Sequence, residues 1–240
     1  MQGFKRNIEV DVHDIDFNGV CRASSLLRYM QSTAQLQLNG NNMSYGQLQD
    51  MKRAFILSKI KLEFNAPVYA EDLLSAITFP CHSTGFSFLR CFQLKRGEET
   101  VGRGISVWAL VDTSSRALVK VSDFNLGLNT YEPFENLSIE RIKMPSQIRV
   151  AGTYKVNYSD LDRNRHINNT HYPDIFANFL PLENMRISAI TINYLHEAKF
   201  GEVLTVHMGE RDGIYYFRTT LEDGRLNSEA EIEIANIWHC

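Results

Sequence analysis

The feature that most constrains the fold of this chain is an internal repeat. HDIDFNGVCRAS at 13–24 superposes on SDLDRNRHINNT at 159–170 with an offset of 146 positions. Further on, LEFNAPVYAEDLL at 62–74 resembles INYLHEAKFGEVL at 192–204 with an offset of 130. Two similarities in the same order indicate a duplicated unit whose second copy is shorter between these landmarks. The chain of 240 residues is therefore expected to form two similar units.

Each copy predicts one opening strand and four later strands. Alternating polar and apolar residues at 8–12 and at 154–158 predict the opening strands, which lead into an Asp-x-Asp turn. Short turns at 96–99, 211–213 and 222–224 connect later runs and indicate antiparallel hairpins. The later runs, rich in β-branched and aromatic residues, are 55–64, 73–80, 86–95 and 101–111, then 187–195, 203–209, 214–221 and 229–237.

A helix is expected directly after each Asp-x-Asp turn. In the first copy Ser24 or Ser25 can cap a helix with one apolar stripe, and Gly40 can end it. In the second copy the helix is shorter, and Asn168 or Asn169 can cap it. Each copy is thus expected to be one helix packed with an antiparallel sheet.

The stretch between the copies reads as a connector. It contains Pro133 and Pro145 and few strand patterns, and 121–128 predicts a short helix. The expected organisation is a first unit at 1–120, a connector at 121–152 and a second unit at 153–240.

Composition excludes several classes of function. Hydrophobic residues make up 44% of the chain, enough for a globular core. No run of about 18 apolar residues predicts a membrane span, and the alternating N-terminal sequence is unlike an export signal, so we expect a cytoplasmic protein. A formal net charge of −3 argues against nucleic-acid binding, which needs concentrated positive charge.

The cysteines give no sign of a metal site. Cys21, Cys81, Cys91 and Cys240 form no C-x-x-C pair and have no zinc-like spacing with histidine. We therefore expect reduced thiols and no bound metal.

Residues 160–169 concentrate carboxylates, amides and an imidazole in ten positions. Such a turn can serve only to cap a helix, because Asp and Asn favour these places. The repeat distinguishes this structural role from a chemical one. Asp162 and Asn164 have matching residues in the first copy, whereas His166 is matched by Val20. The turn therefore forms without a histidine, and His166 is a candidate for a task specific to the second copy.

Glu197 shows the same asymmetry. Its match in the first copy is Pro67, which can neither accept a proton nor bind a positive charge. Asp, Glu, Asn and His suit acyl transfer, in which a carboxylate or imidazole activates water and an amide stabilises the oxyanion. A thioester is the easier acyl target, because a thiol of pKa about 8.5 leaves readily as thiolate. The start of the following helix offers further N–H groups to the oxyanion.

These residues carry a resemblance to a known family. The segment DLDRNRHINN at 160–169 resembles the D-x-D-x-N-x-H-[VI]-N-N motif of plant and bacterial acyl-acyl carrier protein thioesterases. INYLHE at 192–197 is similar to the family's strand ending in a catalytic glutamate, and 108–118 is similar to its Trp-ending strand and T-x-x-R turn. The resemblance covers nearly the whole chain. It implies an α+β tandem hotdog fold, each half a long helix wrapped by an antiparallel β-sheet.

The resemblance also implies the reaction. It assigns catalysis to Asp162, Asn164, His166 and Glu197, and leaves open which carboxylate is the general base. Ala198 stands where some family members carry a cysteine, so hydrolysis by an activated water is expected instead of an acyl-enzyme on that residue. The implied partner is acyl carrier protein. No cofactor is implied, since the phosphopantetheine arrives with the substrate.

Two sets of binding residues follow from the resemblance. The family binds the acyl chain in its first half, and the carrier is acidic, so exposed cations should dock it. The residues expected at the acyl pocket are Leu27, Met30, Phe55 and Leu57. The residues expected to dock the carrier are Arg163, Arg165, Arg141 and Lys143. A monomer and a homodimer are both compatible with two fused hotdog units.

Three other functions compete with this interpretation. The nearest is a thioesterase of the same fold that acts on acyl-coenzyme A. A hotdog hydratase or dehydratase would need a different placement of histidine and acid, and no second motif supports it. A non-catalytic acyl-binding protein is the third, because the first copy shows that the fold exists without the reactive residues.

Overall fold

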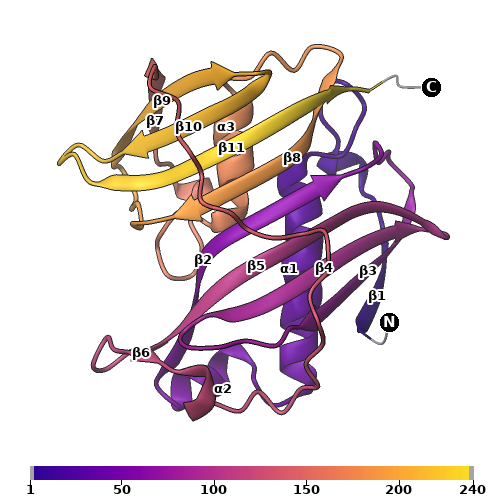
Figure 1. The fold of residues 1–240 in the computed structure, drawn as a ribbon, viewed down its shortest axis with the longest axis vertical. Helices are drawn as coiled ribbons and strands as arrows, with labels where there is room; N and C mark the ends of the chain where they lie inside the picture. Colours follow the sequence, from indigo (N-terminus) through magenta and orange to yellow (C-terminus); the bar gives the residue numbers. More distant parts are fainter. Residues whose placement is uncertain (1–2, 238–240) are drawn as a thin grey trace.

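One antiparallel sheet of eleven strands runs through residues 3–237, the part of the protein that the computed structural model describes (Figure 1). Helix α1 lies against one face of the first half of this sheet, and the shorter α3 lies on the same side in the second half. The first-half strands are β1 (Phe4–Glu9), β2 (Arg53–Phe64), β3 (Leu73–Pro80), β4 (Phe88–Arg96), β5 (Glu99–Asp112) and β6 (Leu118–Val119). The second-half strands are β7 (Arg149–Lys155), β8 (Met185–Tyr194), β9 (Val203–Arg211), β10 (Ile214–Thr220) and β11 (Leu226–Asn236). The α-helices are α1 (Ala23–Gly40), α2 (Tyr45–Asp50) and α3 (Tyr172–Ala177), and the 3-10 helices are η1 (Val12–Asp14), η2 (Val121–Asp123), η3 (Tyr158–Asp160) and η4 (Asn169–His171).

The strand order shows the duplication directly. The order is β1-β3-β4-β5-β2 in the first half and β8-β11-β10-β9-β7 in the second, so each strand has a counterpart in reverse order. Strands β2 and β8 pair at the centre, with Lys61 opposite Thr191. These two residues are separated by the repeat offset of 130. A quasi-two-fold axis therefore passes through this pair, and the tandem hotdog fold is confirmed.

The later strands match the sequence prediction, with ends that shift by up to three residues. Antiparallel pairing through the expected turns is also confirmed for β4–β5, β9–β10 and β10–β11. The two opening strands lie closer to the N-terminus than the predicted ranges 8–12 and 154–158. β1 and β7 end earlier because the chain turns into η1 and η3 before the Asp-x-Asp motif.

The helices differ from the prediction in three places. Neither Ser24 nor Ser25 caps α1; both are buried in its first turn, and Arg22 at the N-cap makes no side-chain cap. The resemblance implied a long helix in each half, but in the described part of the second half α3 has six residues, which agrees with the shorter helix predicted from the pattern, because fewer residues separate the turn from β8. Asn168 does cap the preceding η4, by accepting from the Thr170 N–H. The helix expected at 121–128 is reduced to η2.

The connector crosses the face of the sheet opposite α1 (Figure 1). It closes a second apolar cluster there, in which Leu137 packs with Phe79, Ile105 and two cysteines. Cys21, Cys81 and Cys91 are buried free thiols, and Cys240 lies outside the described residues. Within 3–237, no helix is long and apolar enough to cross a membrane.

Gly104 provides a test of how closely the sheet packs under α1. A Cβ at this position of β5 would lie 2.5 Å from Leu62 Cδ2 and 3.1 Å from the Lys61 carbonyl oxygen. We expect Gly104→Ala to lower the free energy of unfolding by about 1–3 kcal/mol, because the neighbours must move. Gly46→Ala in α2 is the control, since nothing lies within 4 Å of its Cβ. Denaturant unfolding of both variants checks this, and an unchanged midpoint for Gly104→Ala would contradict the packing.

Candidate active site

The loop at 156–168 is a tight turn that its own backbone holds in place. The Asp162 N–H donates to the His166 carbonyl oxygen (2.9 Å), and the Arg165 N–H donates to the Asp162 carbonyl oxygen (3.0 Å). Asp162 Oδ1 accepts from the Asn164 N–H at 2.8 Å. Arg165 has a φ of 65°, in the left-handed region that closes the turn.

The first copy builds the same turn with the same bonds. The Asp16 N–H donates to the Val20 carbonyl oxygen (2.8 Å), and the Asn18 N–H donates to Asp16 Oδ1 (2.9 Å). Gly19, with a φ of 80°, stands where the second copy has Arg165. The backbones therefore correspond, and the two turns differ in the side chains that they present.

The second turn presents an imidazole to a carboxylate from another loop. The Ile167 N–H donates to the Ala198 carbonyl oxygen at 2.9 Å, which fixes the loop after β8 beside the turn. This contact places His166 Nδ1 3.1 Å from Glu197 Oε2. The His166 side chain is 28% exposed and that of Glu197 58%, so water reaches the pair. Lys199 Nζ lies 4.0 Å from the other Glu197 oxygen.

Asp162 and Asn164 form a second pair in the same turn. Asn164 Nδ2 donates to Asp162 Oδ2 at 3.1 Å, so both oxygens of Asp162 accept from Asn164. The Tyr45 hydroxyl, from the start of α2, donates to Asn164 Oδ1 at 3.2 Å. The Arg163 guanidinium lies 3.6 Å above the Tyr45 ring. Three of the predicted catalytic residues thus lie on one turn, Glu197 contacts the turn from the loop after β8, and Tyr45 joins it from the other half.

Tyr45 was missed in the sequence because the second copy has no counterpart of α2. A signal for this helix was present: Ser44 and Gln47 form the S-x-x-Q pattern of a capping box. In the structure the Ser44 side chain accepts from the Gln47 N–H, and the Gln47 side chain accepts from the Ser44 N–H. The capping box fixes the start of α2, and hence Tyr45, against the turn.

Asp160 has a structural role next to this site. It is buried, and its Oδ2 accepts from the Asn157 N–H at 2.7 Å. Burial, together with a hydrogen bond to Asp160, raises the pKa of Tyr154 to about 12. Asp160 therefore anchors the end of β7 to the turn and is not available to a substrate.

The residues expected at the acyl pocket lie in the core of the first half. Leu27, Met30 and Leu57 are buried between α1 and the sheet. Phe55 is half-buried and packs edge-on against Phe88, with ring centroids 5.3 Å apart.

The structure divides the residues expected to dock a carrier between two faces. Arg163 and Arg165 are exposed on the turn beside His166. Arg141 and Lys143 line a polar pocket of about 190 Å³ together with Lys61 and Thr191. That pocket lies on the face opposite α1, so the four cations do not form one surface.

Comparison with known proteins places the whole chain beside one group. A family model described as the acyl-ACP thioesterase N-terminal domain matches residues 1–125, and one described as the acyl-ACP thioesterase C-terminal domain matches residues 145–239. A chloroplastic palmitoyl-acyl carrier protein thioesterase of Gossypium hirsutum is 21% identical over 257 residues. These span 98% of this chain but 59% of the plant protein.

Two solved structures share the full fold. An acyl-ACP thioesterase from Bacteroides thetaiotaomicron aligns with a TM-score of 0.88 and 19% identity, covering 96% of this chain and 97% of its own. The 12:0-ACP thioesterase from Umbellularia californica aligns with a TM-score of 0.80 and 15% identity, covering 98% and 99%. In both alignments the two halves of this chain are arranged as in the matched protein.

The different burial of Asp160 and Asp162 leads to a stability test. Asp160→Ala should lower the free energy of unfolding by about 1–3 kcal/mol, because it removes a buried carboxylate that accepts from the Asn157 N–H and the Tyr154 hydroxyl. Asp162→Ala should cost less, since its two partners belong to one solvent-accessible residue. Denaturant unfolding of both variants checks the order. A larger loss for Asp162→Ala would show that Asp162, not Asp160, supports the fold here.

Proposed function

The chain belongs to the acyl-ACP thioesterase family, and from this premise we propose that it hydrolyses the thioester between a fatty acyl chain and acyl carrier protein. The observation that carries the proposal is the contact of 3.1 Å between His166 Nδ1 and Glu197 Oε2. The first copy has the same backbone turn but Val20 and Pro67 at these two positions. The pair is therefore an addition that folding does not require.

The pair is arranged to activate water. A carboxylate beside Nδ1 favours the tautomer with its proton on that nitrogen, which leaves the lone pair of Nε2 free as a base. Water gives its proton to Nε2 while its oxygen attacks the thioester carbonyl carbon. When the tetrahedral intermediate collapses, the C–S bond breaks, and the imidazolium returns the proton to the leaving thiolate. In this scheme Glu197 orients and stabilises His166.

Asn164 supplies a donor for the oxyanion. One N–H of its carboxamide is held by Asp162 and its Oδ1 by Tyr45, so the amide plane is fixed from two sides. The second N–H remains to donate to the carbonyl oxygen as negative charge develops there. Asp162, with both oxygens engaged by Asn164, acts as a positioning residue. Ala198 provides no nucleophile, which agrees with direct attack by water.

Replacing either member of the pair should abolish most of the turnover. We expect His166→Ala and Glu197→Gln each to lower kcat by about 10²–10⁴-fold, because general base catalysis contributes on that order. The double variant should fall little further, since the two residues act as a unit. His13→Ala, an exposed histidine of the first copy, is the matched control. The measurement is release of free thiol from acyl carrier protein loaded with chains of graded length.

The same assay with acyl-coenzyme A separates the competing functions. If the coenzyme A ester is hydrolysed faster than the carrier-protein ester of equal chain length, the substrate is acyl-coenzyme A and the proposed carrier is wrong. Acyl binding without thiol release in the wild type would identify a non-catalytic acyl-binding protein.

We propose that the exposed cations on the turn dock the carrier. Arg165→Glu should raise KM for the carrier-bound substrate by roughly three- to tenfold, because a rim charge steers association. A small acyl thioester should be hydrolysed as before. The double variant Arg141→Glu, Lys143→Glu reverses two charges on the opposite face and serves as the control. Equal losses on carrier-bound and small substrates would contradict docking through Arg165.

A further inference from the structure

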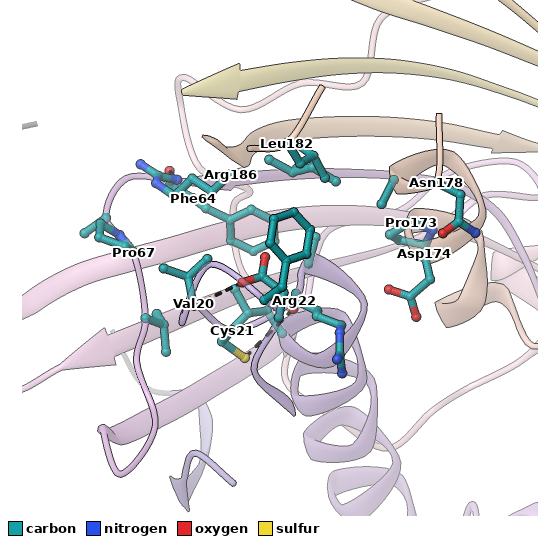
Figure 2. Close-up of a pocket in the computed structure, with 18 residues that line it drawn as sticks. Val20, Cys21, Arg22, Phe64, Pro67, Pro173, Asp174, Asn178, Leu182 and Arg186 are labelled. Carbon is teal, nitrogen blue, oxygen red and sulfur yellow. Dashed lines mark hydrogen bonds between the residues drawn. The ribbon is translucent and has the colours of Figure 1, made fainter. Parts of the chain in front are cut away.

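The quasi-two-fold axis relates the catalytic turn to a second location on the molecule. The axis passes through the Lys61–Thr191 pair. It relates His166 to Val20, which are 146 positions apart, and Glu197 to Pro67, which are 130 positions apart, as in the two repeat offsets. A cavity of about 240 Å³ lies there, and both Val20 and Pro67 line it (Figure 2). The first copy has therefore kept a pocket where the second copy has a reactive pair.

Both halves of the chain form this cavity. Its first-half wall comes from the turn and the start of α1, with Val20 and Leu26, and from the end of β2, with Phe64. Its second-half wall comes from α3, with Ala177, and from the start of β8, with Ile187. Apolar side chains dominate the lining, and the volume is slightly below the range of about 300–1,000 Å³ for drug-sized ligands. The space thus suits a short to medium alkyl chain.

Arg186 gives the cavity an anchor for an anion. It lines the cavity beside Phe64 (Figure 2), and its Nη1 donates to the Phe64 carbonyl oxygen at 2.8 Å. Its Nε is buried and has no acceptor among residues 3–237. Within the same range no carboxylate pairs with this guanidinium. Partial burial lowers the pKa of Arg186, because it disfavours the charged form. The Arg186 side chain as a whole is partly exposed, so its guanidinium, with one N–H unsatisfied and no carboxylate partner, can turn to a ligand carboxylate.

Two carboxylates, Asp16 and Asp174, and a second arginine, Arg22, also line the cavity. Asp16 Oδ1 already accepts from the Asn18 and Val20 N–H groups, at 2.9 and 3.2 Å. Asp174 lines the α3 side of the cavity, and Arg22 lines the side of α1. Arg22 is also the N-cap of α1 and leaves that helix of 18 residues without a side-chain cap, so the positive end of α1 faces the same cavity at Ala23.

We propose that this cavity is a second ligand site, which binds an aliphatic carboxylate of short to medium chain length. The carboxylate accepts from Arg186, and the chain lies against Leu26, Phe64 and Ala177. The ligand class is that of the product of the proposed reaction. Binding here does not depend on that reaction, because the cavity lacks the catalytic pair.

Photolabelling locates the ligand. A medium-chain carboxylate with a diazirine at its far end is irradiated with the full chain, and labelled peptides are mapped by mass spectrometry. We expect labels within 16–26 and 173–187, suppressed by excess octanoate and less well by octanol. Octylamine, which presents a cation to Arg186, should not suppress them. Labels confined to the catalytic turn would overturn the proposal.

Matched variants test the two parts of the site. Ala177→Phe should fill the cavity and remove these labels, while Ala117→Phe, at an exposed position, should leave them unchanged. Arg186→Met should weaken octanoate binding by about tenfold and leave octanol binding unchanged, because the charged hydrogen bond to the ligand is lost; the bond to the Phe64 carbonyl oxygen is lost for both ligands alike. Arg149→Met, at an exposed arginine, is its control. Equal protection by octanoate and octanol in the wild type would refute the carboxylate anchor.

Two measurements distinguish loss of the second site from unfolding of a variant and from failure of the proposed function. The thermal unfolding midpoint of each variant shows whether it is folded, and labels that persist in a folded Ala177→Phe would overturn the site. Thiol release reports on the catalytic turn alone. An inactive protein that is still labelled at 16–26 would refute the proposed function and support the second site.

Discussion

The pairing of β2 with β8 is the interaction on which the other features depend. Their backbone hydrogen bonds join a half of six strands and a half of five into one sheet and remove two exposed edges. Since Lys61 faces its own repeat counterpart Thr191, the register itself generates the quasi-two-fold axis. The axis places both Asp-x-Asp turns on the side of the sheet that carries α1. Each turn thereby lies at the junction of the halves, where a cavity or a cleft can draw side chains from both.

The two turns share the side chain that their backbone needs and differ at positions where the backbone needs none. Asp16 and Asp162 make the same contacts to the following backbone, so this residue is needed for the turn in either copy. Positions 20 and 166 place no such demand on the side chain. One holds a buried valine that closes an apolar pocket, and the other holds a histidine in reach of Glu197. Duplication therefore allowed the chemistry to change while the fold of both turns was kept.

Prediction from the sequence succeeded for features that both copies share, and it failed for segments that one copy has and the other lacks. His166 and Glu197 could be singled out because each had an unreactive counterpart, and the structure places them in contact. Tyr45 has no counterpart, and its contact with Asn164 joins residues 119 positions apart, which no local pattern reveals. The long helix that the resemblance implied in the second half was wrong, whereas the shorter helix that the sequence pattern predicted there is confirmed. The separation of Arg141 from Arg165 depends on the path of the connector, which only the assembled sheet determines.

Arg165 shows how the two copies fill one backbone position with different residues. The turn needs a left-handed residue, and the first copy meets this need with Gly19, which has no Cβ to clash. An arginine in that conformation costs about 1–2 kcal/mol relative to an ordinary backbone geometry. Its side chain is exposed, so no burial in the fold offsets this cost. Other charged residues, such as Lys52 and Glu71, share this conformation, so the backbone tolerates it at several turns. The two copies therefore meet one backbone requirement with different residues, and only the second copy places a cation beside His166.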